Sequence, residues 1–296
     1  MSTSEPDPRA ILAALGVEDA AAVERVSGGW DTAIWRVERG DERFALRVFR
    51  PEQAAMARRE AAVMRAAASA GLPVPRVHAE GAWRDRPALL LAWCAGRPLV
   101  DELRARPWRV WTLGDAFGRM QARIHAVHAP DALRGRPGAW IDWAGPAEEP
   151  LRSRLQAVAS AEEALLHLDY HPLNVMAEGA RLTGVLDWAN ARAGDPRADL
   201  ARTLTILRLT PTPPDVPPLL TLLLRRLLER AWRRGYRQVA GPQRGMGIFY
   251  AWAGGVMVRD LAPKIGQPGV WLEPRHLDDM RGWTERWRRR AGLAGG

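Results

Sequence analysis

The chain has 296 residues, of which 47% are hydrophobic and 26% charged, so it is long enough for one large domain or two lobes with a substantial core. Its single cysteine, Cys94, excludes an intrachain disulfide and favours a reducing, cytoplasmic location. The first residues lack the basic head and apolar core of a signal peptide, and the longest apolar runs, residues 88–95 and 219–224, are too short to span a bilayer, so we expect no membrane partner.

The formal charge of +9 is compatible with a polyanionic partner such as nucleic acid. However, Lys264 is the only lysine among 43 basic residues, which indicates a compositional bias rather than a binding face. The basic run at residues 281–290 could hold phosphates but is more typical of a solvated terminal helix. The 14 tryptophans are spread along the chain, as expected for core and pocket residues rather than a base-stacking surface. We therefore disfavour nucleic-acid binding.

The first predicted elements are a helix and two strands. Residues 8–22 have apolar positions at helical spacing, and residues 23–37 indicate a strand, a glycine turn and a second strand. The turn contains Ser27, Gly28 and Gly29, and glycine lets backbone N–H groups approach the phosphates of a nucleotide. Hairpin turns also use glycine routinely, so this signal is weak alone.

The next segments predict the rest of a small sheet. Residues 44–50 alternate apolar and polar side chains, as in a half-buried strand, and residues 52–70 predict a helix that stops at a Gly-Leu-Pro sequence. A short strand at residues 76–78 and a hairpin at residues 81–92 complete the sheet.

The remainder of the chain is mainly helical in pattern. Residues 113–128 and 151–164 predict helices on either side of a loop-like segment, residues 130–150, that contains Trp140-Ile141-Asp142-Trp143 and could border an acceptor site. Further helices are predicted at residues 198–209, 219–234, 247–260 and 275–290.

The strongest chemical signal is the loop His167-Leu168-Asp169-Tyr170-His171-Pro172-Leu173-Asn174, followed thirteen residues after Asn174 by Asp187. Two apolar runs around a glycine-centred turn separate Asn174 from Asp187, which predicts a hairpin that returns the chain. Asn and Asp oxygens that converge on one point suit Mg²⁺. Asp169 would then be available to orient a hydroxyl or to accept its proton.

These residues resemble a known family. His167-x-Asp169-x-x-x-x-Asn174, then Leu186-Asp187-Trp188, then Gly194-Asp195-Pro196-Arg197-Ala198-Asp199-Leu200-Ala201 are similar to motifs of the aminoglycoside/choline phosphotransferases, a kinase-like family that phosphorylates small molecules. The resemblance covers residues 27 to 201 and is weaker beyond. It implies an α+β, bilobal, protein-kinase-like fold, with an N-terminal nucleotide-binding lobe (residues 1–95) made of an antiparallel sheet and a helix. The larger lobe (residues 96–296) would be mainly helical and carry the catalytic loop and acceptor site.

The resemblance implies a role for each residue of the catalytic loop. Asp169 would be the catalytic residue, and Asn174 and Asp187 would hold Mg²⁺. His167 would brace the loop. Asp195 and Asp199 open a helix, where acidic residues suit capping, and in the family the second of them braces the catalytic loop.

The resemblance also implies a nucleotide site. Arg47 stands where kinases carry a lysine that contacts the α and β phosphates, and Glu60 would fix the position of Arg47. Glu52 is an alternative partner for Arg47, and Arg58 and Arg59 could pair with Glu60 instead. The turn at Ser27, Gly28 and Gly29 would cover the phosphates. Backbone groups of Ala92, Trp93 and Cys94 would contact the adenine edge.

The expected function is Mg²⁺-dependent transfer of the γ-phosphate of ATP, or of GTP, to a hydroxyl of a small metabolite or antibiotic. The alternative is a nucleotide-binding pseudoenzyme that acts as an interaction module, because Arg47 replaces the lysine. The sequence does not indicate an oligomeric state.

The acceptor stays open. The charge of +9 argues mildly against polycationic aminoglycosides, and choline-, sugar- or homoserine-like alcohols and macrolides remain candidates. The carboxylates Asp260, Glu273, Asp278 and Asp279 could form an acidic patch, although solvated helix ends are the preferred interpretation. Trp140, Trp143 and Trp271 could form an apolar or cation-binding wall.

Overall fold

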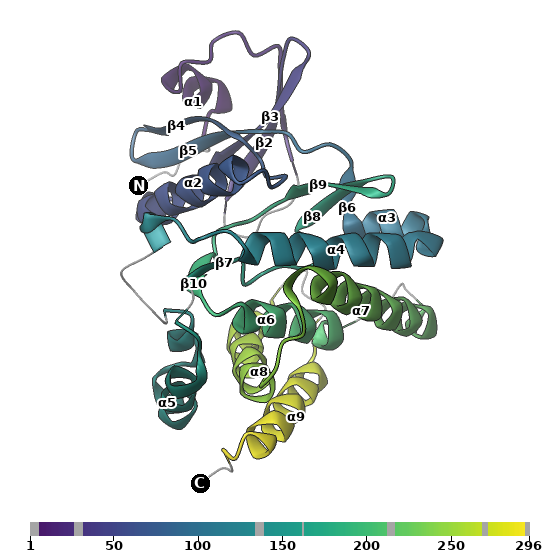
Figure 1. The fold of residues 1–296 in the computed structure, drawn as a ribbon. Helices are drawn as coiled ribbons and strands as arrows, with labels where there is room; N and C mark the ends of the chain where they lie inside the picture. The colour runs from purple at the N-terminus through teal and green to yellow at the C-terminus, as the bar shows by residue number, and fades with distance from the viewer. Residues whose placement is uncertain are drawn as a thin grey trace. The chain divides into compact units, whose positions relative to one another are not determined.

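The computed structural model (Figure 1) describes residues 6–26, 32–133, 139–161, 163–211, 217–267 and 272–293. The chain divides into two compact units. The first contains Met1–Gly96 and Thr183–Ala189, and the second contains Arg97–Leu182 and Asn190–Gly296. Asp187 therefore belongs to the first unit, whereas Asp169 and Asn174 belong to the second. The return of a short segment to the first unit was not predicted.

The first unit is built on a five-stranded antiparallel sheet of order β1-β2-β3-β5-β4. One face of the sheet packs against helix α1 (Pro8–Ala14) through Ile11 and Leu12. Gly16 has a φ of +76° just beyond α1, so the helix ends well before residue 22, where the prediction had placed its end. The strands are β1 (Ala22–Arg25), β2 (Ala33–Arg39), β3 (Glu42–Val48), β4 (Val77–Trp83) and β5 (Arg86–Ala92).

Helix α2 (Ala54–Ser69) follows a short 3-10 turn, η1 (Pro51–Gln53), and packs against β5. Its buried side chains recur at helical spacing and include Ala57, Glu60, Ala61 and Met64. Because Ala88–Leu91 of β5 are buried on both faces of the sheet and α1 covers one of them, α2 covers the other. This packing carries Glu60 into the interior beneath the sheet.

The rest of the chain contains two small groups of strands. β7 (Ala164–Leu166) pairs antiparallel with β10 (Arg192–Gly194). β6 (Arg97–Pro98), β8 (Val175–Glu178) and β9 (Arg181–Val185) form a sheet in the order β6-β8-β9, and the division between the two units falls within β9, after Leu182. The hairpin predicted between Asn174 and Asp187 is present as β8 and β9, with Gly179 at a φ of +64° in its turn. The helix predicted to reach residue 164 ends at residue 158, and the apolar run that follows it forms β7.

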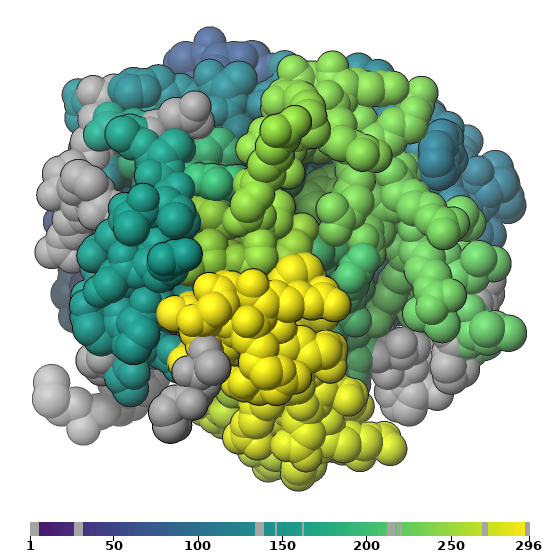
Figure 2. Space-filling model, turned by 60° about the horizontal axis from the view of Figure 1, so that its bottom comes forward, coloured from purple at the N-terminus to yellow at the C-terminus, as the bar shows by residue number. Residues whose placement is uncertain are grey.

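Helices make up most of the second unit. Figure 2 shows α9 crossing one face of this unit, with α5 on one side of it and α7 on the other. None of the described helices combines the length and hydropathy that a bilayer span requires. The helices are α3 (Leu99–Ala105), α4 (Val110–His125), α5 (Glu149–Val158), α6 (Pro196–Leu209), α7 (Pro218–Ala240), α8 (Gly247–Leu261) and α9 (Pro274–Arg290). Short 3-10 turns are η2 (Pro107–Arg109), η3 (Asp131–Leu133), η4 (Ile141–Ala144), η5 (Pro146–Glu148) and η6 (Ala262–Lys264).

Glycines allow α4 and α7 to pack unusually closely. A Cβ atom on Gly118 would lie 2.0 Å from the carbonyl oxygen of Trp232, and one on Gly235 would lie 2.1 Å from that of Asp115. At this short separation the indole Nε1 of Trp232 donates to the Oε1 atom of Gln121 over 2.8 Å. The packing therefore orients the side chain of Gln121 on α4. The predicted α+β class, with an antiparallel sheet followed by a mainly helical region, is confirmed.

Candidate active site

The loop that carries Asp169 contains a residue in an unfavourable backbone conformation. Leu168 is buried and has a φ of +62°, a region that costs a non-glycine residue about 1–3 kcal/mol. Its N–H donates to Asp199 Oδ1 over 2.6 Å, and its carbonyl oxygen accepts from Arg202 Nε over 3.2 Å. The N–H of His167 also donates to Asp199, over 3.3 Å to Oδ2. Side chains of α6 thus hold the strained loop in place.

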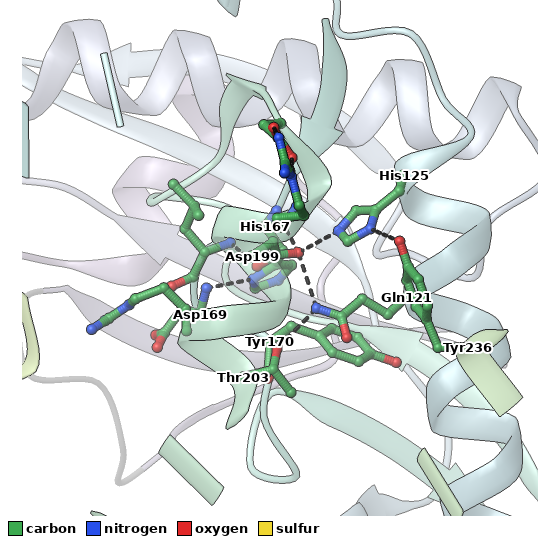
Figure 3. Close-up of polar contacts among 12 residues, drawn as sticks. Gln121, His125, His167, Asp169, Tyr170, Asp199, Thr203 and Tyr236 are labelled. Atoms are coloured by element: carbon green, nitrogen blue, oxygen red, sulfur yellow. Dashed lines mark hydrogen bonds and ion pairs between the residues drawn. The ribbon is translucent and has the colours of Figure 1, made fainter. Parts of the chain in front are cut away.

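Asp199 is the centre of a buried polar network (Figure 3). Its Oδ2 atom lies 2.8 Å from His125 Nε2 and accepts a hydrogen bond from Gln121 Nε2 over 3.2 Å, while His125 Nδ1 lies 2.9 Å from the hydroxyl of Tyr236. Burial alone would raise the pKa of Asp199, but the hydrogen bond and charge of His125, with the charge of His167, lower it. Asp199 is therefore an ionised anchor that connects α4, α6 and α7 to the loop, which agrees with its expected bracing role.

Asp169 itself faces partly outward, with a quarter of its side chain exposed. Its Oδ1 atom lies 3.5 Å from His171 Nε2, and its backbone N–H donates to His167 Nδ1 over 3.3 Å. Burial raises the pKa of Asp169, but the hydrogen bond and charge of His171 and the charges of Arg202 and His167 outweigh it and lower the pKa to about 2. Asp169 is therefore ionised at neutral pH and available to accept a hydrogen bond from a hydroxyl.

Asn174 is tied to Asp169 by its amide nitrogen. Nδ2 donates to the carbonyl oxygen of Asp169 over 3.0 Å and to Asp169 Oδ2 over 3.3 Å, and it lies 3.2 Å from His171 Nε2. Within the described part of the chain, all side-chain hydrogen bonds of Asn174 run through Nδ2. The Oδ1 oxygen is therefore left for another partner, and an amide oxygen suits a hard cation.

The first unit holds the predicted ion pair between Arg47 and Glu60. Arg47 Nη1 lies 2.5 Å from Glu60 Oε1, and Arg47 Nε donates to Thr32 Oγ1 over 3.1 Å. Burial raises the pKa of Glu60, the charge of Arg47 opposes this, and that of Asp187 adds to it. Of the alternative partners, Glu52 lies in the exposed turn before α2, and Arg59 instead donates to the carbonyl oxygen of Ala189 over 3.4 Å.

Asp187 lies in the same unit as Arg47 and points toward it. Its Oδ1 atom is 3.6 Å from Arg47 Nη2, and 46% of its side chain is exposed. Asp187 has a φ of +60°, a conformation that aspartate tolerates better than most residues. The neighbouring Trp188 is buried and donates from Nε1 to the carbonyl oxygen of Val185 over 3.0 Å. The turn after β9 is therefore fixed by Trp188, and it presents Asp187 beside Arg47.

The segment expected to contact adenine has part of its backbone already engaged. The N–H of Ala92 donates to the carbonyl oxygen of Arg76 over 2.8 Å, and the N–H of Trp93 donates to the carbonyl oxygen of Arg43 over 2.9 Å. These two N–H groups are therefore not available to a base, and base recognition by this segment stays a prediction. Burial raises the pKa of the Cys94 thiol to about 11, so it is not an activated nucleophile. The glycine turn at residues 27–29 lies outside the described residues.

A family model for a phosphotransferase enzyme family matches residues 22–241. The chain belongs to this family. The predicted family and the predicted phosphotransferase class are thereby confirmed. No curated protein matches the chain.

Solved structures with low sequence identity share the fold of the phosphotransferase. A protein assigned as an aminoglycoside phosphotransferase from Ralstonia eutropha JMP134 is 20% identical with a TM-score of 0.72, covering 98% of this chain and 99% of that chain. Aminoglycoside phosphotransferase APH(4)-Ia in complex with AMP-PNP and hygromycin B is 17% identical with a TM-score of 0.66, covering 95% and 96%. Amicoumacin kinase hAmiN in complex with AMP-PNP, Ca²⁺ and Ami is 12% identical with a TM-score of 0.67, covering 92% and 89%. The kinase-like fold expected from the sequence is therefore confirmed.

Several residues that organise the phosphotransferase loop were missed by sequence reasoning. Gln121 and His125 are far from the loop in sequence, and no motif spacing connects them to Asp199. Arg202 could have been found, because it follows Asp199 by one helical turn. Asp195 was correctly expected to cap α6, and its Oδ1 accepts from the N–H of Arg197 over 2.9 Å.

The tryptophans expected near the acceptor have different roles. Trp140 is buried and packs edge-on against Trp252 with ring centroids 5.0 Å apart, so it is a core residue. Trp143 is partly exposed and has the guanidinium of Arg192 5.1 Å from its ring centroid. Trp271 lies outside the described residues.

Proposed function

We propose that this phosphotransferase transfers the γ-phosphate of ATP to a hydroxyl group of a small molecule and that it requires Mg²⁺. The observation that supports this most directly is the loop from His167 to Asn174, in which the buried Asp199 holds the backbone and Asn174 contacts Asp169. Related structures were solved with AMP-PNP and with hygromycin B or Ami, which supports an adenine nucleotide and a small acceptor. GTP is the alternative donor. We place the enzyme in the cytoplasm, in line with its single cysteine.

Asp169 would act on the acceptor hydroxyl. A carboxylate with a pKa of about 2 is a weak base, so it does not remove a proton from an alcohol before the reaction begins. Instead, Asp169 orients the hydroxyl by accepting its hydrogen bond. It takes the proton late, once the new bond to phosphorus makes the hydroxyl strongly acidic. His167 is buried and accepts from the Asp169 N–H, so its role is to hold the loop.

Asn174 and Asp187 have the donor atoms that Mg²⁺ requires. Asn174 has its amide nitrogen engaged and its oxygen available, and Asp187 presents a half-exposed carboxylate on a fixed turn. Oxygen ligands of this kind fit Mg²⁺, which keeps part of its water shell and completes its coordination with phosphate oxygens. When bound, Mg²⁺ would neutralise charge on the β and γ phosphates. A related structure was solved in complex with AMP-PNP and Ca²⁺, which supports a divalent cation as the cofactor.

Arg47 would contact the α and β phosphates from the first unit, assisted by the turn at residues 27–29, with the segment Ala92, Trp93 and Cys94 at the base. Its guanidinium has one edge on Glu60 and another directed at Asp187. Arginine is always charged and offers several donors in one plane, so it can hold Glu60 and a phosphate oxygen together. The pseudoenzyme alternative rested on Arg47 replacing a lysine, and the pair with Glu60 speaks against it because the arginine is held as the lysine would be.

The test is nucleotide binding and phosphate transfer in parallel. We expect millimolar ATP to raise the melting temperature in Mg²⁺ but not in EDTA, because a ligand at a hundred times its dissociation constant adds about 2.7 kcal/mol. Asp187→Ala should lose the Mg²⁺-dependent shift. Asp169→Ala should keep it while turnover falls by about a thousandfold or more.

Asp278→Asn is the matched control, because this exposed carboxylate on α9 pairs only with Arg281 in the described part of the chain. An Asp169→Ala enzyme that turns over within tenfold of the parent would remove Asp169 from this role. A shift of equal size in Mg²⁺ and EDTA would contradict the metal assignment.

A further inference from the structure

The guanidinium of Arg47 is held at two of its three nitrogen atoms by hydrogen bonds within the first unit. Nη1 lies 2.5 Å from Glu60 Oε1, and Nε donates to the hydroxyl oxygen of Thr32 over 3.1 Å. The central carbon of the guanidinium lies 4.9 Å from the ring centroid of the buried Phe49. Only 15% of the Arg47 side chain is exposed. These neighbours therefore fix the side chain before any ligand binds.

Thr32 reaches Arg47 because of the register of the sheet. It directly precedes β2, in which Ile34 pairs with Arg47 of β3. Side chains two positions apart in an extended chain lie on the same face of a sheet, so Thr32 shares the face of Ile34 and Arg47. Such diagonal neighbours are about 7–8 Å apart, which a long side chain can span. The backbone thus places the hydroxyl of Thr32 where the guanidinium can donate to it.

The two hydrogen bonds determine where the third nitrogen atom points. A guanidinium is planar, so anchoring Nε and Nη1 fixes its rotation within the plane, and Phe49 contacts one face of that plane. Nη2 is directed at Asp187, whose Oδ1 atom is 3.6 Å away, which is longer than a hydrogen bond. Nη2 therefore keeps donor capacity beside the carboxylate that would hold Mg²⁺ and, with it, the phosphates.

A lysine at position 47 could not use Thr32 in this way. Its ammonium group is a point charge at the end of a flexible chain, and lysine has a methylene group where arginine has Nε. The ammonium could still pair with Glu60, as in the kinase pattern that the sequence resembles. The hydroxyl of Thr32 is therefore a contact that serves an arginine at this position but not a lysine.

We propose that Thr32 is a positioning residue that adapts this nucleotide site to an arginine in place of the lysine. Its hydroxyl fixes the guanidinium of Arg47 so that Nη2 meets a phosphate oxygen of the nucleotide. Because the side chain is already ordered, less conformational entropy is lost when the nucleotide binds. This inference rests on the proposed function, since it requires Arg47 to contact phosphate.

A double-mutant cycle measures the coupling between Thr32 and Arg47. Calorimetry gives the dissociation constant of MgATP for the parent, Thr32→Val, Arg47→Lys and the double variant. Valine keeps the branched shape of threonine but removes the hydroxyl. We expect Thr32→Val to weaken MgATP binding by about tenfold, because a hydrogen bond to a charged group is lost. In the Arg47→Lys background the same change should weaken binding by less than about twofold, because lysine does not use the hydroxyl.

Two further variants separate positioning from a structural role. Thr32→Ser keeps the hydroxyl and should bind MgATP within about threefold of the parent, so it should rescue most of the loss seen with valine. Thr221→Val removes an exposed hydroxyl on α7 in the second unit and should leave the affinity unchanged. Thr32→Ala, measured in parallel, provides the same comparison if valine lowers the stability of the protein.

The inference is wrong if Thr32→Val binds MgATP as tightly as the parent, or if Thr32→Ser is as weak as Thr32→Val. It is also wrong if the effects of Thr32→Val and Arg47→Lys simply add, because the hydroxyl would then act independently of the guanidinium. A parent protein without any Mg²⁺-dependent nucleotide shift would instead refute the proposed function, and this inference with it.

Discussion

Replacing Asp199 by asparagine should separate the loop from its anchor without changing the volume of the side chain. Asparagine keeps one carbonyl oxygen, which can still accept from the Leu168 N–H. Its amide nitrogen would then stand where Oδ2 accepts from Gln121, His125 and the His167 N–H. Three donors would face a fourth donor in a fully buried position.

The size of the effect follows from these contacts. Each buried donor left without an acceptor costs about 1–3 kcal/mol, and breaking a buried charged network commonly costs about 3–5 kcal/mol in total because the neighbours adjust. The strain at Leu168 would add to this, because its φ of +62° is held through the same carboxylate. We therefore expect the free energy of unfolding to fall by about 3–5 kcal/mol and the loop to lose its geometry.

Urea denaturation at pH 7 measures the loss, with Asp278→Asn as the control. Asp278 pairs with Arg281 on the surface, where a single pair contributes about 0–1 kcal/mol, so the control should stay within about 0.5 kcal/mol of the parent. If Asp199→Asn were as stable as this control, the carboxylate would not be the anchor of the loop. A stable variant with full turnover would refute the reasoning more completely, because the loop would then hold its shape without these hydrogen bonds.

Three further outcomes are expected. Because folding lowers the pKa of Asp199, its contribution to the free energy of unfolding is complete above about pH 3.9, the ordinary aspartate pKa, and is lost as the pH falls through the lower pKa of the folded state. Urea denaturation across this range should show the difference in stability between the parent and Asp199→Asn shrinking as the pH falls. Arg47→Lys should weaken MgATP binding by about tenfold, because lysine keeps the charge but loses the second edge of the guanidinium. Arg47→Met, which has no charge, should weaken it by more than about a hundredfold, and calorimetric titration measures both affinities. Gly118→Ala should lower the free energy of unfolding by about 1–3 kcal/mol, since its Cβ would lie 2.0 Å from the carbonyl oxygen of Trp232, whereas Gly255→Ala, with no atom within 4 Å, should be neutral or stabilising.

The loop from His167 to Asn174 could be recognised in the sequence as a candidate site because its polar residues lie at short, ordered spacings. Asp169 and Asn174 are five positions apart on one turn, and the hairpin that follows has its own glycine signal at Gly179. The pair of Arg47 and Glu60 was also accessible, because a strand followed directly by a helix leaves few acidic partners in reach.

The residues beneath the loop could not be predicted in the same way. Gln121 and His125 reach Asp199 across 78 and 74 positions of sequence, through packing that two glycines permit between α4 and α7. Such contacts depend on how helices dock, and a single sequence holds no spacing that reveals it. The helix predicted at residues 151–164 ends at residue 158, and of β7 it had included only Ala164, which fits a helix as well as a buried strand.

Arginine content alone is a poor guide to function in this chain, but burial distinguishes surface arginines from those held in the interior. One lysine among 43 basic residues means that almost every cationic position is an arginine, whatever its role. Arg281 is 61% exposed and Arg275 is 73% exposed, so each keeps its hydration and is nearly neutral for stability. Arg47 and Arg202 have only 15% and 6% of their side chains exposed, and a guanidinium cannot lose its charge to escape burial as a lysine can. Each is therefore retained in the interior by carboxylates: Arg47 pairs with Glu60 and Asp187, and Arg202 pairs with Asp260. The same compositional bias that hides these residues in the sequence thus supplies the site with planar, permanently charged groups, which suit phosphate and carboxylate oxygens.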